Sequence, residues 1–209
     1  MSLRFNALAC AAAAVSVLAV TPVRAAGDAG LGEKKFYTCF GCHGVENYKN
    51  AYPDYSVPKL RHQTALYIVA ALQEYRSGER PHATMHAQAA SLSDQDMLDI
   101  AAYLQGPEPQ KPTDTMVGTT PAQAAACTAC HGVNGRGVDA PLEPKPPILA
   151  GQYADYLVQA ITQYRSGRRK NAIMTGMTLS LATDEDVKAV AGYFAGQQSS
   201  LLTAKIDNK

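Results

Sequence analysis

The chain has 209 residues, of which 46% are hydrophobic and 18% charged, and its 19 basic and 18 acidic side chains give a formal net charge of +1. This length predicts one or two domains, and the composition excludes a disordered, collagen-like or polytopic membrane protein. The near-neutral charge does not indicate a nucleic-acid partner.

The first 25 residues have the pattern of a cleaved secretory signal. Arg4 forms a positive n-region, residues 7–20 are small and apolar apart from Ser16, and small residues precede a cleavage site after Ala25. The apolar run is shorter than the roughly 20 residues that a membrane-spanning helix needs. We therefore predict an exported protein, in which cleavage removes Cys10 and leaves four cysteines.

These four cysteines form two C-x-x-C-H motifs, at residues 39–43 and 127–131. In this motif the two thiols add to the vinyl groups of a porphyrin and the adjoining histidine binds the iron. Two copies therefore predict two covalently bound haem c groups. The residues concerned are Cys39, Cys42, Cys127 and Cys130 for attachment and His43 and His131 for the iron.

Three other uses of the cysteines were considered. A single zinc ion could take both C-x-x-C pairs but would leave the two adjoining histidines unexplained. A thioredoxin-like dithiol would need a βαβ context, and no alternating β-branched run flanks either motif. A disulfide within C-x-x-C closes a loop too small to constrain much of the unfolded chain.

Each half of the remaining sequence predicts helices. Apolar residues recur at three-to-four-residue spacing over residues 66–75 and 153–164, and a glycine follows each run. A closing helix in each half begins after Ser93 or Thr183, each of which has an aspartate three residues later, as in a capping box. An all-α fold follows.

The two halves are copies of one unit. Equivalent residues are separated by 88 positions at the haem histidines, by 89 at the Tyr-Arg-Ser-Gly segments (75–78 and 164–167) and by 90 at Asp94 and Asp184. Such drift indicates loop insertions in a duplicated domain. We predict a signal peptide at residues 1–25, a first domain at 26–106, a proline-rich linker at 107–120 and a second domain at 121–209.

A methionine occupies the same place in each half. Met85 follows His43 by 42 residues, and Met174 follows His131 by 43. A lone methionine usually fills a core, but equivalence in two repeats favours Met85 and Met174 as distal ligands of the two irons.

Other side chains could take the distal position. Met177 is near Met174, but its equivalent in the first half is Gln88. His62, His82 and His86 could give the first haem two histidine ligands, but none has a histidine counterpart in the second half.

The succession of signal peptide, C-x-x-C-H-G, Pro-x-Leu-x-x-Gln, Tyr-Arg-Ser-Gly, Met, Leu-Ser-Asp-Gln-Asp and Ala-Ala-Tyr-Leu resembles dihaem class I c-type cytochromes, most closely the cytochrome c4 family. The resemblance spans essentially the whole mature chain. It implies two tandem class I cytochrome c domains, His/Met ligation of each haem, and periplasmic electron transfer between respiratory-chain components. It also implies that the carbonyls of Pro58 and Pro147 orient the proximal histidines.

With both axial positions filled, no open site remains for peroxide or oxygen, so we expect one-electron transfer and no catalysis. Its partners would be redox proteins: a donor dehydrogenase or reductase and a terminal oxidase or reductase. Two alternatives stay open, the cytochrome subunit of a larger dehydrogenase such as a flavocytochrome, and a dihaem peroxidase with one labile distal position. Peripheral association with a membrane also stays open.

The halves differ in charge. Residues 26–110 carry 7 basic and 10 acidic side chains, and residues 111–209 carry 10 basic and 8 acidic ones. The basic excess includes a run just before Met174. We weigh two interpretations of this run: a positive rim near the haem edge that steers an acidic partner, or a solvated helix end. Its members are Arg165, Arg168, Arg169 and Lys170.

Overall fold

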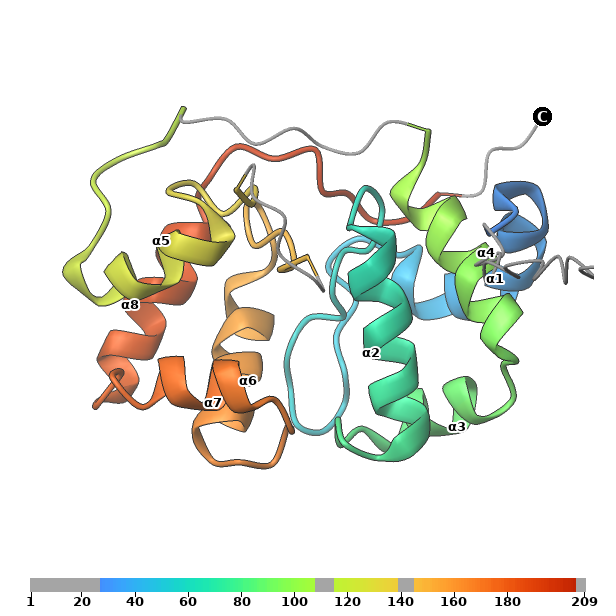
Figure 1. The fold of residues 1–209 in the computed structure, drawn as a ribbon, viewed down its shortest axis with the longest axis horizontal. Coiled ribbons are helices and arrows are strands. Elements are labelled where there is room, and N and C mark those ends of the chain that lie inside the picture. Colours follow the sequence, from blue (N-terminus) through green and yellow to red (C-terminus); the bar gives the residue numbers. More distant parts are fainter. Residues whose placement is uncertain (1–26, 108–114, 139–144, 206–209) are drawn as a thin grey trace, which may run out of the picture.

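The computed structural model describes residues 27–107, 115–138 and 145–205. The expected signal peptide and half of the expected linker therefore lie outside the described residues. Within the described part the chain forms helices joined by irregular segments, with two isolated antiparallel bridges, Lys49 to Ser56 and Arg61 to Leu202, in place of a sheet. Figure 1 shows two groups of helices side by side, α1 to α4 and α5 to α8.

Four of the helices, α2, α4, α6 and α8, lie where the sequence patterns predicted them. The first group consists of α1 (Ala29–His43), α2 (Ala65–Ser77), α3 (Ala83–Ala90) and α4 (Asp94–Gln105). The second consists of a 3-10 turn, η1 (Ala122–Ala124), followed by α5 (Ala125–His131), α6 (Ala154–Arg165), α7 (Ala172–Thr178) and α8 (Asp184–Ala195).

Both closing helices have the expected capping box. The Ser93 hydroxyl accepts a hydrogen bond from the Asp96 amide and the Asp96 carboxylate accepts one from the Ser93 amide, and Thr183 and Asp186 do the same at α8. Such caps satisfy amides that the first helical turn leaves without partners. Gly78, just after α2, has a φ of 82°, the left-handed conformation that ends many helices.

The first core lies where α1 crosses α4. Gly32 lies at the crossing, and a Cβ at this position would come within 1.9 Å of the Asp99 carbonyl oxygen. The absent side chain thus lets the two backbones touch. Phe36 and Leu104, each 1% exposed, fill the space beside the crossing together with residues of α2.

The second core forms mainly between α6 and α8. Phe194, Val190 and Leu157 are buried there, and Ala124 of η1 covers the cluster on the side that α1 occupies in the first domain. The short α5 carries the second C-x-x-C-H motif and ends at His131.

The segment after α8 leaves the second domain. Figure 1 shows it in red, running across the molecule to α4. Leu202 and Arg61 exchange two backbone hydrogen bonds of 3.0 and 3.1 Å, and the Ala204 amide donates to the His43 carbonyl at 3.1 Å. Ala204 also belongs to the first core. The segment around residues 202–205, which the sequence assigned to the second domain at 121–209, therefore packs on the first domain.

The domains meet through a repeated pair of glutamines. Gln63 donates to the Ile148 carbonyl and accepts from its amide at 3.0 and 2.9 Å, and Gln152 makes the same two bonds with Lys59 at 3.0 Å each. Both glutamines are buried and each is the repeat equivalent of the other. The interface is therefore pseudo-symmetric.

Among the residues that the structure describes, no helix is both long enough and apolar enough to cross a membrane.

Candidate haem-binding sites

Each domain holds its motif histidine in one orientation. His43 ends α1, and its Nδ1 lies 3.0 Å from the Pro58 carbonyl oxygen; His131 ends α5, and its Nδ1 lies 2.9 Å from the Pro147 carbonyl oxygen. An imidazole that donates from Nδ1 to a carbonyl presents an unprotonated Nε2 to a metal. The two prolines expected from the resemblance therefore lie beside the two histidines.

Burial keeps both imidazoles neutral. Burial, with smaller contributions from His82 and Arg80, lowers the pKa of His43 to about 4 against the opposing hydrogen bond to Pro58. Burial likewise lowers the pKa of His131. A neutral imidazole is the form that binds iron, so these donors are ready to act at physiological pH.

The four motif cysteines are partly exposed, and no disulfide joins them. Cys39 and Cys127 also pack against the first and second cores. Burial raises the pKa of both of these thiols. Cys39 and Cys127 therefore belong to different domains of the structure, each beside its own motif histidine.

The two candidate methionines lie in the first turn of equivalent short helices, α3 and α7. The Met85 amide donates to Nδ1 of His82 at 3.2 Å, and the Met174 amide donates to the Asn171 side chain at 2.9 Å. His82 and Asn171 are the N-caps of α3 and α7, so the same local device places both methionines. Met85 and Met174 are half-buried, whereas the side chain of Met177 is exposed.

The three other candidate histidines are used differently. Both ring nitrogens of His82 contact protein groups. Its Nδ1 accepts from the Met85 amide, and its Nε2 is 3.3 Å from the Asn50 side-chain oxygen. His86 is exposed, with Nδ1 2.8 Å from the Tyr75 carbonyl oxygen. His62 has a positive φ of 68° and its amide donates to the Leu104 carbonyl.

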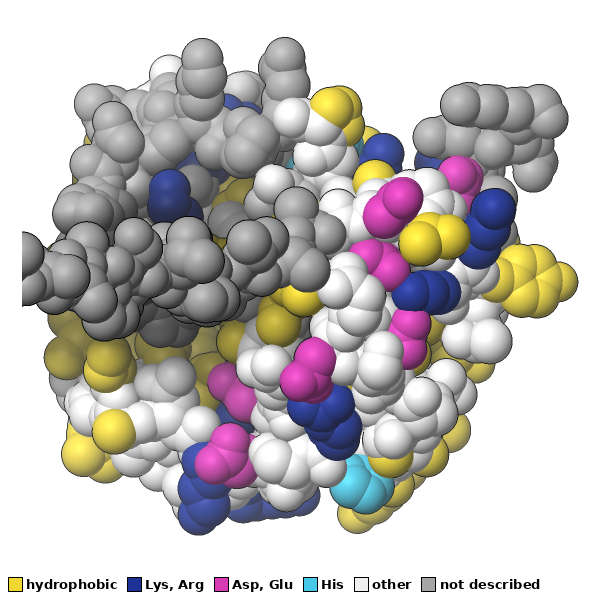
Figure 2. Space-filling view, turned by 45° about the vertical axis from the view of Figure 1, so that its right-hand side comes forward, with side chains coloured by type: hydrophobic (Ala, Val, Ile, Leu, Met, Phe, Trp, Pro, Cys, Tyr) yellow, Lys and Arg dark blue, Asp and Glu magenta, His cyan; other side chains and the backbone are white. Residues whose placement is uncertain are grey.

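The basic run before α7 is not one exposed rim. Arg169 is only 2% exposed, because residues of the first domain cover it. Arg165 binds Asp184 at 2.5 Å, and only Arg168 and Lys170 are fully exposed. Of the two interpretations weighed for this run, a positive rim formed by all four residues does not fit, because Arg169 is buried. On the face of the first domain in Figure 2, acidic and basic side chains lie interspersed.

Sequence reasoning missed Arg80. This residue is 5% exposed and lies at the domain interface, where its Nη2 donates to the Tyr156 hydroxyl at 2.5 Å. A signal for it existed: Arg80 and Arg169 both stand two residues after the glycine of Tyr-Arg-Ser-Gly.

The chain is similar to known proteins in sequence. The cytochrome c family model matches the chain twice, at residues 30–106 and 118–197. Over 196 residues the chain is 34% identical to cytochrome c4 of Stutzerimonas stutzeri, an alignment that covers 82% of this chain and 90% of the relative. It is 35% identical over 173 residues to a thiosulfate dehydrogenase electron acceptor of Stutzerimonas stutzeri (strain A1501), covering 75% of this chain and 77% of that one.

A solved structure gives the same result. The crystal structure of reduced recombinant cytochrome c4 from Pseudomonas stutzeri matches with a TM-score of 0.62 at 31% identity, over 83% of this chain and all of that chain. The predicted fold of two tandem cytochrome c domains is thus confirmed, and the C-x-x-C-H motif in each domain accounts for covalent attachment. The chain therefore belongs to the cytochrome c family, as an electron-transfer protein similar to cytochrome c4 that carries two covalently bound haem c groups.

Proposed function

We propose that this protein is a periplasmic dihaem cytochrome that passes single electrons between respiratory-chain donors and acceptors. The observation that carries the proposal is the repeated site: a buried histidine whose Nδ1 faces a proline carbonyl, and a half-buried methionine held by an N-cap, once in each domain.

In this proposal His43 and His131 bind the irons through Nε2, and Pro58 and Pro147 fix the planes of the two rings. Met85 and Met174 would supply the distal thioethers. A bound haem supplies a one-electron iron couple, and a thioether ligand favours its reduced state. With His and Met filling both axial positions, the protein offers peroxide no coordination site, which argues against the peroxidase alternative.

Ligand identity is tested by separate replacement of the two methionines of α7. Met174→Ala should abolish the near-infrared band of Fe(III)–Met ligation for one of the two haems and lower that haem's reduction potential. Met177→Ala is the matched control, because this exposed residue lies on the same helix. If Met177→Ala removes the band and Met174→Ala does not, the proposed ligand is wrong.

A second candidate is the electron-accepting subunit of a dehydrogenase. It is favoured by the relative described as a thiosulfate dehydrogenase electron acceptor. An apolar strip on and after α7, formed by Ile173, Met177 and Leu179 at 71%, 44% and 67% exposure, would suit a protein partner. Co-purification of an enzyme at fixed stoichiometry would favour this candidate, and a free cytochrome reduced in periplasmic extract would favour the first.

The periplasmic location rests on the N-terminal sequence. Cell fractionation and N-terminal sequencing of the mature protein test it together. We expect the chain to start at Ala26 in the periplasmic fraction, and an uncleaved chain in the cytoplasm would contradict the proposal.

A further inference from the structure

A loop of the first domain, residues 48–57, is fastened to the second domain. Asp155, the second residue of α6, accepts hydrogen bonds from the Ser56 amide at 2.9 Å and from the Ser56 hydroxyl at 2.8 Å. The Lys49 ammonium lies 3.8 Å from the same carboxylate oxygen. Ser56 is only 5% exposed, so little water competes for its hydroxyl. Figure 1 shows this loop between the two groups of helices, where domain docking holds it in place.

This contact breaks the symmetry of the interface. Asp155 stands 89 residues after Leu66, the offset that also separates the two interface glutamines, Gln63 and Gln152. A leucine side chain cannot accept a hydrogen bond, so the equivalent position on α2 cannot hold a loop of the second domain in this way. Docking therefore constrains the two domains differently.

The same loop holds the side chain that caps α3. The backbone and side-chain nitrogens of Asn50 both donate to the Tyr55 carbonyl, at 3.0 and 3.1 Å. His82 accepts from the Met85 amide at Nδ1, so its proton is on Nε2, which lies 3.3 Å from the Asn50 side-chain oxygen. The buried Tyr55 ring has its centroid 6.5 Å from that of His82 and 6.4 Å from that of Tyr156 on α6. Hydrogen bonds and ring packing thus both join α6 to the N-cap of α3.

The equivalent cap in the second domain is built differently. The Asn171 side chain accepts from the Met174 amide, and within the described residues it makes no hydrogen bond to the first domain. The neighbouring Lys170 amide donates to the Glu79 carbonyl at 2.9 Å, a backbone contact in which α6 takes no part. Asp155 is therefore connected to the helix of Met85 and not to the helix of Met174.

We propose that Asp155, a residue of the second domain, is a positioning residue for the distal ligand of the first haem. It acts through loop 48–57 and His82, which fix the first turn of α3 and with it the Met85 thioether. Separation of the domains would release the loop, weaken the bond between Met85 and iron and expose the first haem to other ligands. This inference rests on the proposed function, because it takes Met85 as a ligand.

The test measures how readily imidazole displaces methionine from the oxidised protein, followed as loss of the near-infrared Fe(III)–Met band. Two backgrounds resolve the haems, because Met174→Ala leaves only the band that depends on Met85, and Met85→Ala leaves only the band that depends on Met174. Asp155→Ala should raise the apparent imidazole affinity about three- to tenfold in the Met174→Ala background, the range expected for one lost hydrogen bond. It should leave the affinity in the Met85→Ala background unchanged.

The matched control is Asp184→Ala. Asp184 is likewise an aspartate in the first turn of a second-domain helix, but it pairs with Arg165 of its own domain, so both affinities should stay unchanged. Asp155→Asn keeps an acceptor oxygen for Ser56 and should raise the affinity less than Asp155→Ala does. His82→Asn gives α3 the cap of α7 but has no atom at the place of Nε2, so it should keep the band and abolish the effect of Asp155→Ala.

The outcomes distinguish this inference from the proposed function. A Met174→Ala protein without any near-infrared band would show that Met85 is not a ligand, and would overturn both. If the band is present but Asp155→Ala leaves the imidazole affinity unchanged, or raises it equally in both backgrounds, only this inference is wrong. Should Asp155→Ala fail to fold, Asn50→Ala decides, because it removes the contact with His82 inside the first domain and should raise the affinity of the first haem by a similar factor.

Discussion

In the first domain, α1 spans 15 residues and crosses α4 at Gly32, whereas the second domain has only η1 and the seven-residue α5 in that place. Both nevertheless hold a histidine against a proline carbonyl at nearly the same distance. The orientation of the haem histidine therefore does not depend on the scaffold beside it, and we expect the second domain to obtain more of its order from the cofactor.

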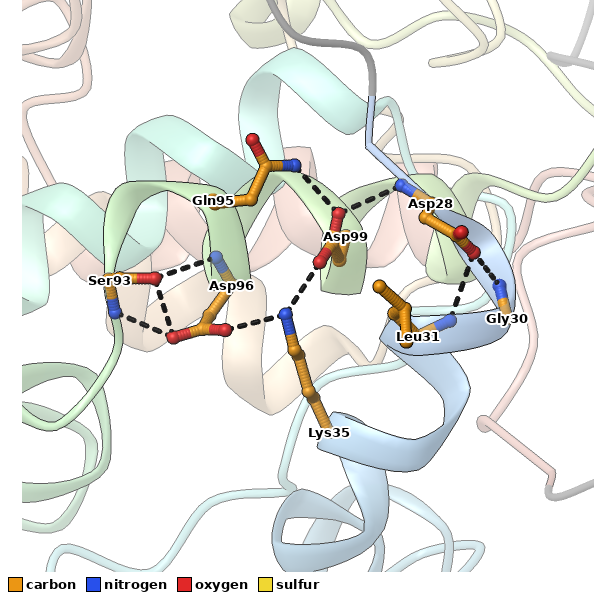
Figure 3. Close-up of polar contacts among 8 residues, drawn as sticks. All are labelled: Asp28, Gly30, Leu31, Lys35, Ser93, Gln95, Asp96 and Asp99. Carbon is orange, nitrogen blue, oxygen red and sulfur yellow. Dashed lines mark hydrogen bonds and ion pairs between the residues drawn. The ribbon is translucent and has the colours of Figure 1, made fainter.

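A polar network marks the same difference. Lys35 of α1 binds the carboxylates of Asp96 and Asp99 at 2.6 Å each, and Asp99 also accepts from the Asp28 amide and the Gln95 side chain at 2.8 Å (Figure 3). In the second domain, Gln123 takes the place of Lys35 and donates to Asp186 at 3.1 Å. The position that matches Asp99 there is Ala189. The two ion pairs at the first helix crossing are thus replaced, in the second domain, by one hydrogen bond from an uncharged side chain.

Loss of haem attachment should have the largest effect, and the two domains should respond to it differently. A Cys127→Ala/Cys130→Ala variant should lose one haem and essentially all hydrogen-exchange protection in α5 to α8, because that core lacks a long first helix. A Cys39→Ala/Cys42→Ala variant should lose the other haem but retain part of the protection where α1 crosses α4. Peptide-resolved exchange measures both. Equal loss of protection in the two variants would show that the crossing of α1 and α4 does not keep the first domain ordered without its haem.

Gly32→Ala should have the second largest effect. The added Cβ would meet the Asp99 carbonyl, and backbone atoms cannot move aside, so we expect the free energy of unfolding to fall by about 3 kcal/mol, as in a severe overpacking. Gly192→Ala in α8 is the control, because nothing lies within 4 Å of its Cβ, and it should stabilise by about 0.5–1 kcal/mol. Denaturant unfolding followed by helix signal measures both. A neutral Gly32→Ala would show that the crossing is not tight.

The glutamine pair should respond equally in the two domains. Gln63→Ala and Gln152→Ala each leave one buried backbone amide and carbonyl without their partner, which costs about 1–3 kcal/mol. Small-angle scattering should show loosened docking in either variant. If only one of them loosens the domains, the interface is less symmetric than the contacts indicate.

Lys35→Gln should have the smallest effect, since it gives the first domain the pairing of the second. Hydrogen bonds from Lys35 are the largest cause lowering the pKa of Asp96 and Asp99. Carboxyls with a lowered folded-state pKa stabilise the fold above their unfolded pKa of about 3.9, and this stabilisation is lost as pH falls through the folded-state value.

The variant should therefore be less stable than the wild type at neutral pH, and the difference should shrink as pH falls below about 4. Thermal unfolding across this range measures it. A difference that stays constant down to acid pH would mean that Lys35 acts by packing alone.

The features that the sequence predicted correctly depend on residues that lie close together along the chain. The haem motifs, the capping boxes at Ser93 and Thr183 and the repeat offset are local patterns, and local patterns specify caps, helices and covalent attachment. The positions of Met85 and Met174 were also fixed by repetition, although their role as ligands stays a prediction.

What the sequence did not predict depends on docking. Arg168 and Arg169 are adjacent in one basic run, yet one is exposed and the other is buried beneath Tyr67 and Glu74 of the other domain. Nothing within the run distinguishes them, because the covering residues lie about 95–102 positions away. For the same reason no pattern indicated that the tail after α8 would join the first core.

That tail brings the two ends of the described chain to the same helix. At one end of the described chain the Asp28 amide donates to Asp99, and at the other the Lys205 carbonyl accepts from the Tyr103 hydroxyl. Asp99 and Tyr103 are one turn apart on α4, so both ends are fastened to the same helix. A linker could join Asp28 to Lys205, and new ends could be opened elsewhere in a circular permutant. Because Ala204 and Lys205 pack on the first domain, that domain completes its packing only after the segment that follows α8 has been synthesised.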